Sequence, residues 1–146
     1  MRVFLDTNVL VAAFVTRGLC RDLLAEIIHR HELILGAPVV AEARRILPAK
    51  LGLSEALVMR RLGVLADYLV ECPAVEGIDI EVRDPNDVDI VLCAIGCRAD
   101  VLVSGDRDLL QAMLPLRVLS PRELWQILRH GLDPDTVHEP AATFGP

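Results

Sequence analysis

The sequence predicts an α/β fold, a three-layer α/β/α sandwich around a mostly parallel sheet of about five strands. Two observations predict this class: short apolar runs alternate with segments of helical periodicity through residues 1–130, and acidic residues follow several of the runs. With 146 residues, of which 53% are hydrophobic, the chain can build one core and is too short for two domains. This apolar content also excludes an intrinsically disordered chain.

The first elements are predicted from the apolar runs and from the acid, glycine and proline residues that end or follow them. Residues 2–6 form a short apolar run that ends in an acid, which favours a buried parallel strand. Apolar residues then recur at helical spacing over residues 19–31, and residues 32–35 indicate a second strand. Gly36 stops this strand, and Pro38 suits the first turn of the helix that follows.

The middle of the chain predicts two helices and a short strand. The helix near Pro38 is expected to end at Pro48, because proline disrupts a helix interior. A further helix is expected over residues 54–68, and a strand over residues 69–71. A turn-like stretch then leads through Gly77.

Helix caps mark the elements of the second half. Asp84 is placed to cap a helix, with Pro85 at its first position and Asp87 at its third, and this helix is expected to run to about residue 99. A strand is expected over residues 100–104, where an apolar run precedes a glycine.

The remaining elements complete the alternation of strands and helices. A helix is expected over residues 106–114 and a strand over residues 117–119. Ser120 and Glu123 then form the pattern of a capping box, which predicts a last helix over residues 124–130.

Composition changes after residue 130. Residues 131–146 contain three prolines, no periodicity and few large apolar side chains. We therefore predict a single domain over residues 1–130 and a flexible C-terminal tail over residues 131–146.

The cysteines do not predict a disulfide framework. Cys20, Cys72, Cys93 and Cys97 contain no C-x-x-C pair, and no secretory signal is apparent. Cys93 and Cys97 share a helix face at i,i+4 spacing and are interpreted as small core residues.

The apolar stretches do not predict a membrane protein. The longest are only about half of the roughly 18 residues that a membrane-spanning helix needs. Asp6 and Asn8 interrupt the apolar N-terminus where a signal peptide would be continuous. We therefore expect a cytoplasmic protein with no membrane partner.

Four acids are predicted to gather at one edge of the sheet. In an open α/β sheet, ligands bind outside the carboxyl ends of the strands. Each acid has a structural alternative, as a helix cap or a solvated surface residue, but an acid directly after the first apolar run is costly to bury without a role. The four are Asp6, Glu42, Asp87 and Asp106.

Clustered carboxylates predict a hard divalent cation. The carboxylates repel one another in a half-buried cleft, and a bound cation would offset this repulsion. Mg²⁺ or Mn²⁺ prefers oxygen ligands and retains waters, which suits metal-assisted hydrolysis of a phosphodiester bond. The net charge of −6 argues against a nucleic-acid partner, yet the rest of the domain is close to balanced once these four acids and those of residues 131–146 are set apart.

Four segments together resemble the PIN-domain ribonucleases, and most closely the branch of toxin components of toxin–antitoxin pairs similar to VapC. The first of these segments is weak alone, whereas all four in the same order are specific. They are Asp6-Thr-Asn8, Pro38-Val-Val-Ala-Glu42-Ala-Arg-Arg-Ile-Leu47, Arg83-Asp-Pro-Asn-Asp87 with Ala94 seven residues on, and Val103-Ser-Gly-Asp106-Arg-Asp-Leu-Leu110.

The resemblance implies an activity and partners. It implies a Mg²⁺- or Mn²⁺-dependent endoribonuclease that acts on RNA and leaves 3′-hydroxyl and 5′-phosphate ends. It also implies a homodimer and a small antitoxin protein as partner. The 53% apolar content agrees with a dimer, for which the predicted helix over residues 54–68 is a candidate surface.

The resemblance also assigns roles to residues. The acid-rich sequence leaves the third acid open among Asp84, Asp87 and Asp89. Carried over by position, the catalytic and metal-binding acids of the family match Asp6, Glu42, Asp87 and Asp106, with Asn8, Ser104 and Asp108 as supporting residues.

Two alternatives stay open. The haloacid-dehalogenase phosphatases also end their first strand with Asp and carry a late Gly-Asp pair such as Gly105-Asp106, but their first motif needs a second acid where this chain has Asn8. A PIN-like module that holds RNA or protein without cutting is the non-enzymatic alternative. An intact set of mutually repelling acids argues against it.

Overall fold

Five parallel strands form one sheet in the computed structural model, which describes residues 1–131. Their order is β3-β2-β1-β4-β5, so β1 lies at the centre of the sheet. This architecture confirms the predicted three-layer α/β/α class, and each of the four strand pairs is parallel. The strands are β1 (Arg2–Leu5), β2 (Glu32–Gly36), β3 (Leu69–Val70), β4 (Val101–Val103) and β5 (Arg117–Leu119).

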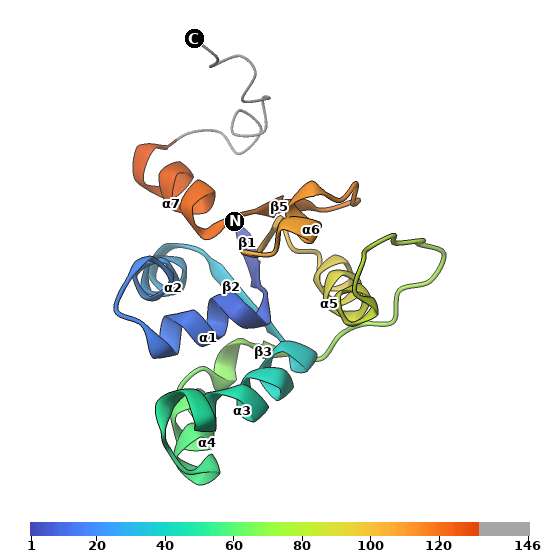
Figure 1. Ribbon diagram of the computed structural model, residues 1–146. Helices are drawn as coiled ribbons and strands as arrows, with labels where there is room; N and C mark the ends of the chain where they lie inside the picture. Colours follow the sequence, from blue (N-terminus) through green and yellow to red (C-terminus); the bar gives the residue numbers. More distant parts are fainter. Residues whose placement is uncertain (132–146) are drawn as a thin grey trace.

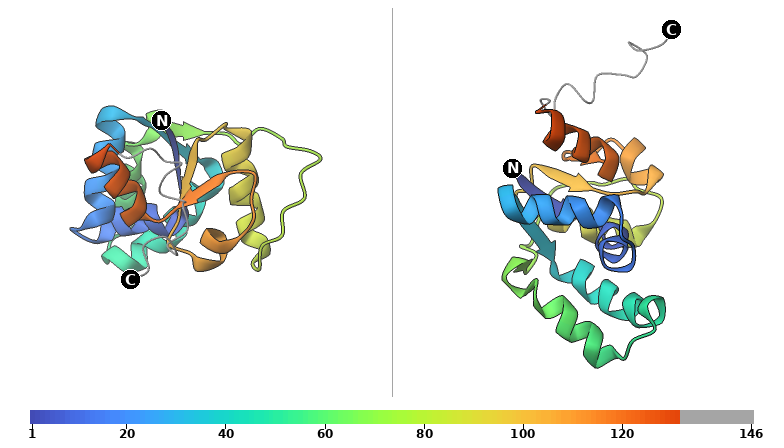
Figure 2. Two further views of the ribbon diagram at one scale, coloured as in Figure 1. Left: turned by 90° about the horizontal axis from the view of Figure 1, so that it is seen from above. Right: turned by 90° about the vertical axis from the view of Figure 1, so that its left-hand side faces the viewer.

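Helices cover both faces of the sheet (Figures 1 and 2). The helices α1, α2 and α7 lie on one face and α5 and α6 on the other, while α3 and α4 lie at the side of β3. Among the described residues, no helix combines the length and apolar character needed to cross a bilayer. The helices are α1 (Thr7–Val15), α2 (Leu19–Arg30), α3 (Ala37–Leu51), α4 (Glu55–Gly63), α5 (Pro85–Gly96), α6 (Arg107–Gln111) and α7 (Pro121–His130), with a 3₁₀ turn η1 (Ala66–Tyr68).

The core is built on strands that are buried on both faces. Phe4 of β1, Ile34 of β2 and Leu102 of β4 are all inaccessible to solvent or nearly so. Continuous apolar runs are typical of parallel strands with helices on both sides, which is why these short segments form strands. Burial of each such side chain contributes about 1.5–3 kcal/mol to folding.

Two helices connect β1 to β2, where the sequence predicted one. The helix α1 begins directly after Asp6 and precedes α2. It is apolar almost all round, with Val9, Leu10 and Val11 buried on successive positions. Such a helix has no amphipathic period, so its sequence pattern does not indicate a helix.

The helix α3 continues through Pro48 instead of ending there. It runs to Leu51 and ends at Gly52, whose φ of +64° lies in the left-handed region. Proline removes one backbone donor, so α3 loses a single hydrogen bond at Pro48 and continues for only three residues beyond it. The prediction that Pro48 ends this helix is therefore wrong by one turn.

Two other predicted helices are shorter in the structure. The helix predicted over residues 54–68 divides into α4, which ends at Gly63, and the 3₁₀ turn η1. The helix predicted over residues 106–114 ends at Gln111. Boundaries of this kind depend on packing rather than on local pattern.

The predicted caps are confirmed. Asp84 caps α5 by accepting a hydrogen bond from the backbone N–H of Asn86, and Ser120 and Glu123 form a capping box at α7. The last helix ends at Gly131, whose φ is +64°. The rest of the predicted tail, residues 132–146, lies outside the described residues.

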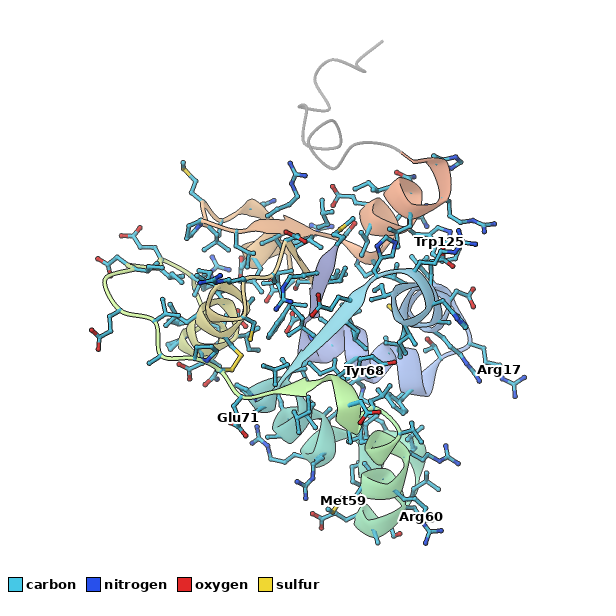
Figure 3. The ribbon with its side chains drawn as sticks, turned by 180° about the vertical axis from the view of Figure 1, so that it is seen from behind. Arg17, Met59, Arg60, Tyr68, Glu71 and Trp125 are labelled. Atoms are coloured by element: carbon cyan, nitrogen blue, oxygen red, sulfur yellow. A yellow bond between two sulfur atoms is a disulfide. The ribbon has the colours of Figure 1, made fainter. Side chains whose placement is uncertain are left out.

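The structure contains a disulfide between Cys72 and Cys93, which corrects the prediction that Cys93 is only a core thiol. Cys72 follows β3 and Cys93 lies in the middle of α5, with their Cα atoms 4.8 Å apart. Figure 3 shows the bond in yellow beside α5. The pairing joins residues 21 positions apart, a proximity that only the tertiary fold creates. Cys97 is buried and unpaired, as predicted for a core residue.

Candidate active site

The carboxyl edge of the sheet is open at the boundary between β1 and β4. The chain leaves β1 towards β2 on one side, while β4 lies on the other side of β1. This is the topological switch point of the sheet, where ligands bind in open α/β folds. The backbone N–H of Asp6 donates to the carbonyl of Val103 at 2.9 Å, so the two strands stay paired up to the site.

Asp6 is a buried carboxylate with two local donors. The backbone N–H of Thr7 donates to its Oδ1 at 2.7 Å, and the hydroxyl of Ser104 donates to its Oδ2 at 2.7 Å. Burial raises the pKa of Asp6 above its usual range, and the two hydrogen bonds oppose that shift. The negative charges of Glu42 and Asp106 raise this pKa further.

Ser104 joins two of the predicted site acids. It follows β4 and is fully buried. Its Oγ donates to Asp6 and accepts a hydrogen bond from the backbone N–H of Asp106 at 3.0 Å. The hydroxyl therefore links the ends of β1 and β4.

Asp106 begins α6. Its Oδ1 accepts a hydrogen bond from the backbone N–H of Asp108 at 2.8 Å, so it caps this short helix. The cap uses only Oδ1 of Asp106, so its second carboxylate oxygen stays available for the site.

Glu42 reaches the edge from the second turn of α3. Its Oε2 accepts a hydrogen bond from the side-chain hydroxyl of Thr7 at 3.0 Å. This contact holds Glu42 next to the start of α1, so it is not a solvated surface residue. Sequence reasoning assigned no role to Thr7, although it stands between Asp6 and Asn8 in the first segment.

Asp87 lies in the first turn of α5 and faces the other acids. Its pKa is raised to about 6, first by burial and then by the charges of Asp106, Asp6, Asp84 and Glu42. The structure thus brings Glu42 and Asp106 within electrostatic reach of Asp6, and brings all three within reach of Asp87. Among the described residues, the charged groups that shift the pKa values of Asp6 and Asp87 are all acids.

The neighbouring acids and amide lie less centrally. Asp84 is exposed and its side chain caps α5, and Asp89 is also exposed. Asn8 is exposed at the second position of α1, and Asp108 lies 4.0 Å from Arg83. Of the three candidates for the third acid, Asp87 is the least exposed, and the charges of Asp106, Asp6 and Glu42 contribute to its raised pKa.

The chemistry of these side chains fits a hard divalent cation. Four carboxylates supply oxygen ligands and an excess of negative charge that a cation would relieve. Within residues 1–131, however, no group of three or more His, Cys, Asp or Glu side chains is arranged so that it could hold a metal ion as it stands. Two of the four acids, Asp6 and Asp106, also cap helices.

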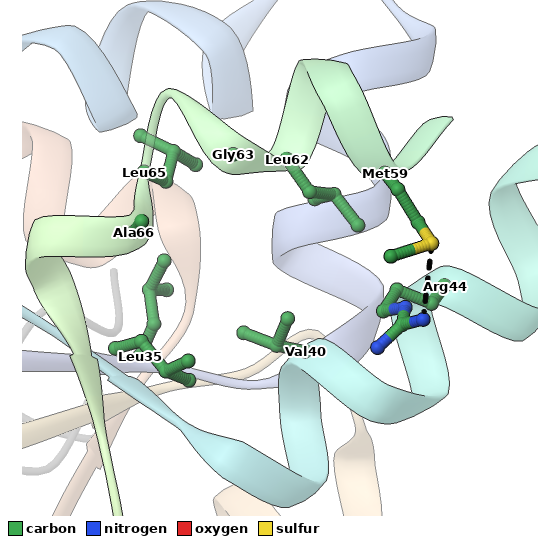
Figure 4. A pocket seen from close by; sticks show the side chains of 9 residues that line it. Leu35, Val40, Arg44, Met59, Leu62, Gly63, Leu65 and Ala66 are labelled. Atoms are coloured by element: carbon green, nitrogen blue, oxygen red, sulfur yellow. Dashed lines mark hydrogen bonds between the residues drawn. The ribbon is translucent and has the colours of Figure 1, made fainter. Parts of the chain in front are cut away.

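The apolar hollows of the molecule lie elsewhere. One, of about 150 Å³, lies between α3, α4 and β3 and is lined by Leu35, Val40 and Met59 (Figure 4). At its mouth, an Nη of Arg44 donates to the sulfur of Met59 at 3.1 Å. A second, of about 460 Å³, lies between α1, α2 and α4. None of the four acids lines either hollow, so the candidate site is the open edge of the sheet.

Comparisons with known proteins agree with this geometry. The family model described as PIN domain matches residues 2–108, which include all four acids. No curated protein matches the chain by sequence. These results assign a family and no individual relative.

Two solved structures share the fold. One is a chain of VapBC2 from Rickettsia felis, in a structure bound to a DNA fragment from the promoter. Its TM-score is 0.60 and its sequence identity 17%, and the match covers 82% of this chain and 98% of that chain. A chain of VapBC-1 from nontypeable Haemophilus influenzae is similar with a TM-score of 0.59 and 18% identity, over 84% of this chain and 99% of that chain. TM-scores of about 0.6 show a shared fold, and at 17% and 18% identity the likeness is one of fold alone.

Proposed function

The chain belongs to the PIN domain family, and on that premise we propose that it is a Mg²⁺- or Mn²⁺-dependent endoribonuclease acting at the carboxyl edge of β1 and β4. One observation carries the proposal: carboxylates from four different segments meet at the switch point of the sheet, where the charges of Glu42 and Asp106 act on Asp6 and the charges of all three act on Asp87. Such an arrangement is unfavourable without a cation, and perturbed pKa values are typical of functional sites.

The four acids would hold the metal. When bound, a divalent cation supplies a Lewis acid that activates water and offsets the charge of the scissile phosphate. Asp6 and Asp106 are tied together through Ser104, and Glu42 is held by Thr7. With a pKa of about 6, Asp87 is mostly ionised at neutral pH and able to serve as a ligand.

The proposed reaction is hydrolysis of an RNA phosphodiester bond. The oxygen of water bonds to phosphorus, the bond from phosphorus to the 3′ oxygen breaks, and that oxygen takes up a proton. The products are a 3′-hydroxyl and a 5′-phosphate. The chain's own contribution is to orient the carboxylates of Asp6 and Glu42 through Ser104 and Thr7, while the backbone of Asp106 is tied to Ser104.

We further propose that the protein is the toxin of a toxin–antitoxin pair and works in the cytoplasm. The support is the fold shared with chains of two VapBC structures. The expected antitoxin would be a small protein, and the expected assembly is a homodimer. Leu57 and Met59 of α4 are exposed, which supports α4 as the dimer surface, and light scattering of the purified protein at micromolar concentration tests it.

Cleavage of labelled RNA tests the proposed activity. Purified protein is incubated with single-stranded RNA and Mn²⁺, with and without EDTA, beside Asp6→Asn prepared in parallel. Cleavage that requires Mn²⁺ and is lost in Asp6→Asn supports the proposal. Asp67→Asn, which changes an exposed acid of η1, is the matched control and should cut like the wild type. Equal cleavage by wild type and Asp6→Asn would identify a contaminating nuclease.

The second candidate function is an RNA- or protein-binding module without catalysis. The observation that favours it is the lack of a ready-made ligand set within residues 1–131. RNA binding without cleavage in the presence of Mn²⁺ would select this function. Membership of the PIN domain family leaves the phosphatase alternative without support.

A further inference from the structure

Thr7 contacts two of the four acids at once. Its backbone N–H donates to Asp6 Oδ1 at 2.7 Å, and its hydroxyl donates to Glu42 Oε2 at 3.0 Å. Thr7 is 2% exposed, so its contact with Asp6 is buried and its contact with the half-exposed Glu42 is part-buried. Asp6 follows β1 directly, and Glu42 lies in α3, 36 positions later in the chain. Thr7 therefore connects two segments that only the fold brings together.

The helix itself does not need this hydroxyl. Asp6 already provides the side-chain cap of α1, and threonine is a weaker helix former than alanine. A buried hydroxyl requires a hydrogen-bond partner, and here the partner is a carboxylate, to which hydrogen bonds are stronger than to neutral groups. The side chain of Thr7 is therefore directed at the site.

Together, Thr7 and Ser104 link three acids in one chain of hydrogen bonds. The chain runs from Glu42 through Thr7 to Asp6, and from Asp6 through Ser104 to the backbone of Asp106. At Glu42 the hydroxyl of Thr7 holds one carboxylate oxygen in place, and the other oxygen can turn to a cation. Outer-shell donors of this kind orient metal ligands in proteins.

We propose that Thr7 is a positioning residue, which orients Glu42 relative to Asp6 for the cation that the site takes up. This inference rests on the proposed metal-dependent function. Thr7 touches neither RNA nor cation in this role and acts through Glu42 alone.

Two substitutions at Thr7 separate the hydroxyl from the shape of the side chain. Thr7→Val removes the hydroxyl and keeps the branched shape, whereas Thr7→Ser keeps the hydroxyl. Mn²⁺ affinity is measured by isothermal titration calorimetry, and cleavage of labelled RNA is measured in parallel. Thr7→Val is expected to weaken Mn²⁺ binding by about 10-fold, the scale for loss of an outer-shell partner, and Thr7→Ser by less than about twofold.

A hydroxyl at the far end of α1 gives the matched control. Thr16 donates its hydroxyl to the carbonyl of Ala12 at 2.8 Å, where the helix ends. Thr16→Val loses a hydrogen bond of α1 without approaching the acids, so its Mn²⁺ affinity should equal that of the wild type. If Thr7→Val does not fold, Thr7→Ala removes the same hydroxyl in a better helix former.

The outcomes distinguish the two proposals. A wild-type protein that binds no Mn²⁺ overturns the proposed function and this inference with it. A wild type that binds Mn²⁺, with Thr7→Val binding equally well, overturns only the role of Thr7, as does an equal loss in Thr7→Val and Thr7→Ser. In a Glu42→Ala background, Thr7→Val should change the affinity by less than about twofold, because coupled residues are not additive.

Discussion

Single residues at the edge of the sheet serve two purposes. Asp6 and Asp106 cap the helices that follow them and also lie within reach of the other acids. A cap uses one carboxylate oxygen, so the structural role and the proposed functional role are compatible. Asp84 and Asp87 divide these tasks: Asp84 caps α5, and Asp87, three residues later, faces the acids.

Amide substitutions in α5 should separate these two roles. Asp87→Asn is expected to lower RNA cleavage by more than about 100-fold, because loss of a ligand should cost more than loss of an outer-shell partner, which costs about 10–100-fold. Asp84→Asn should keep both cleavage and stability, because Asn caps helices as well as Asp does. The measurements are initial cleavage rates and thermal midpoints. An inactive Asp84→Asn with an active Asp87→Asn would make Asp84 the ligand.

The raised pKa of Asp87 predicts a pH dependence of stability. Its pKa in the folded protein, about 6, lies above the ordinary value of 3.8, so the folded state holds the proton more tightly. The free energy of unfolding should therefore fall as pH rises from about 4 to about 6 and then level off. Thermal unfolding in EDTA checks this, and in Asp87→Asn the decline should be smaller. Parallel curves for both proteins would contradict the prediction.

At the scale of elements, α5 is held against the sheet at two points. A Cβ at Gly36, the last residue of β2, would lie 2.7 Å from Phe4 Cζ and 2.8 Å from Cys93 Sγ. Close packing of the strand end, β1 and α5 therefore requires glycine at this position. The disulfide from Cys72 to Cys93 attaches α5 to the segment after β3.

Gly36→Ala should destabilise the protein. The added methyl group has no room, and overpacking of a core costs about 1–3 kcal/mol. Gly63→Ala is the matched control, because a Cβ there meets nothing within 4 Å, and it should be neutral or stabilise the last turn of α4. Urea unfolding at neutral pH measures both. An unchanged midpoint for Gly36→Ala would show that β2 and α5 can move apart without cost.

The disulfide should contribute measurably to stability. Closing a loop between residues 21 apart is expected to stabilise the folded state by about 3 kcal/mol, mainly by restricting the unfolded chain. Treatment with dithiothreitol should lower the thermal midpoint of the oxidised protein. Cys72→Ala should already have the lower midpoint and show no response to the reductant. A reductant effect of equal size in that variant would assign the change to another cause.

At the scale of the whole molecule, charge is distributed unevenly. The net charge is −6, and at one edge of the sheet the charges of Glu42 and Asp106 reach Asp6, and those of all three reach Asp87. This edge lies between the helical layers, where β1 meets β4, and is away from the apolar hollows beside α4. The fold therefore separates a candidate surface for assembly from the candidate site for catalysis.

A divalent cation should stabilise the whole domain. Binding to the folded state alone adds about 2.7 kcal/mol at a concentration 100 times the dissociation constant. Thermal unfolding at millimolar Mn²⁺ and at matched ionic strength with NaCl measures the shift. Asp6→Asn should show a smaller shift than wild type. Equal midpoints in Mn²⁺ and NaCl would argue against a metal site.

The sequence by itself determined the fold class, the order of most elements and the acids worth testing. Apolar runs too short for amphipathic helices predict parallel strands, and local cap patterns such as Ser120 with Glu123 predict helix starts. These signals are local, because they depend on residues that are near one another in the chain. The carboxyl ends of parallel strands share one edge, so the strand pattern alone is enough to place Asp6 and Asp106 at the same edge of the sheet.

Only the tertiary structure decided the contacts between distant segments. The bond from Thr7 to Glu42, the disulfide from Cys72 to Cys93 and the packing of Gly36 join residues without a shared local pattern. The helix α1 was missed for a different reason, since apolar side chains almost all round it remove the periodicity that identifies a helix. Thr7 and Glu42, like Ser104 and Asp6, are far apart in the chain. They become partners only because of how all the elements pack together.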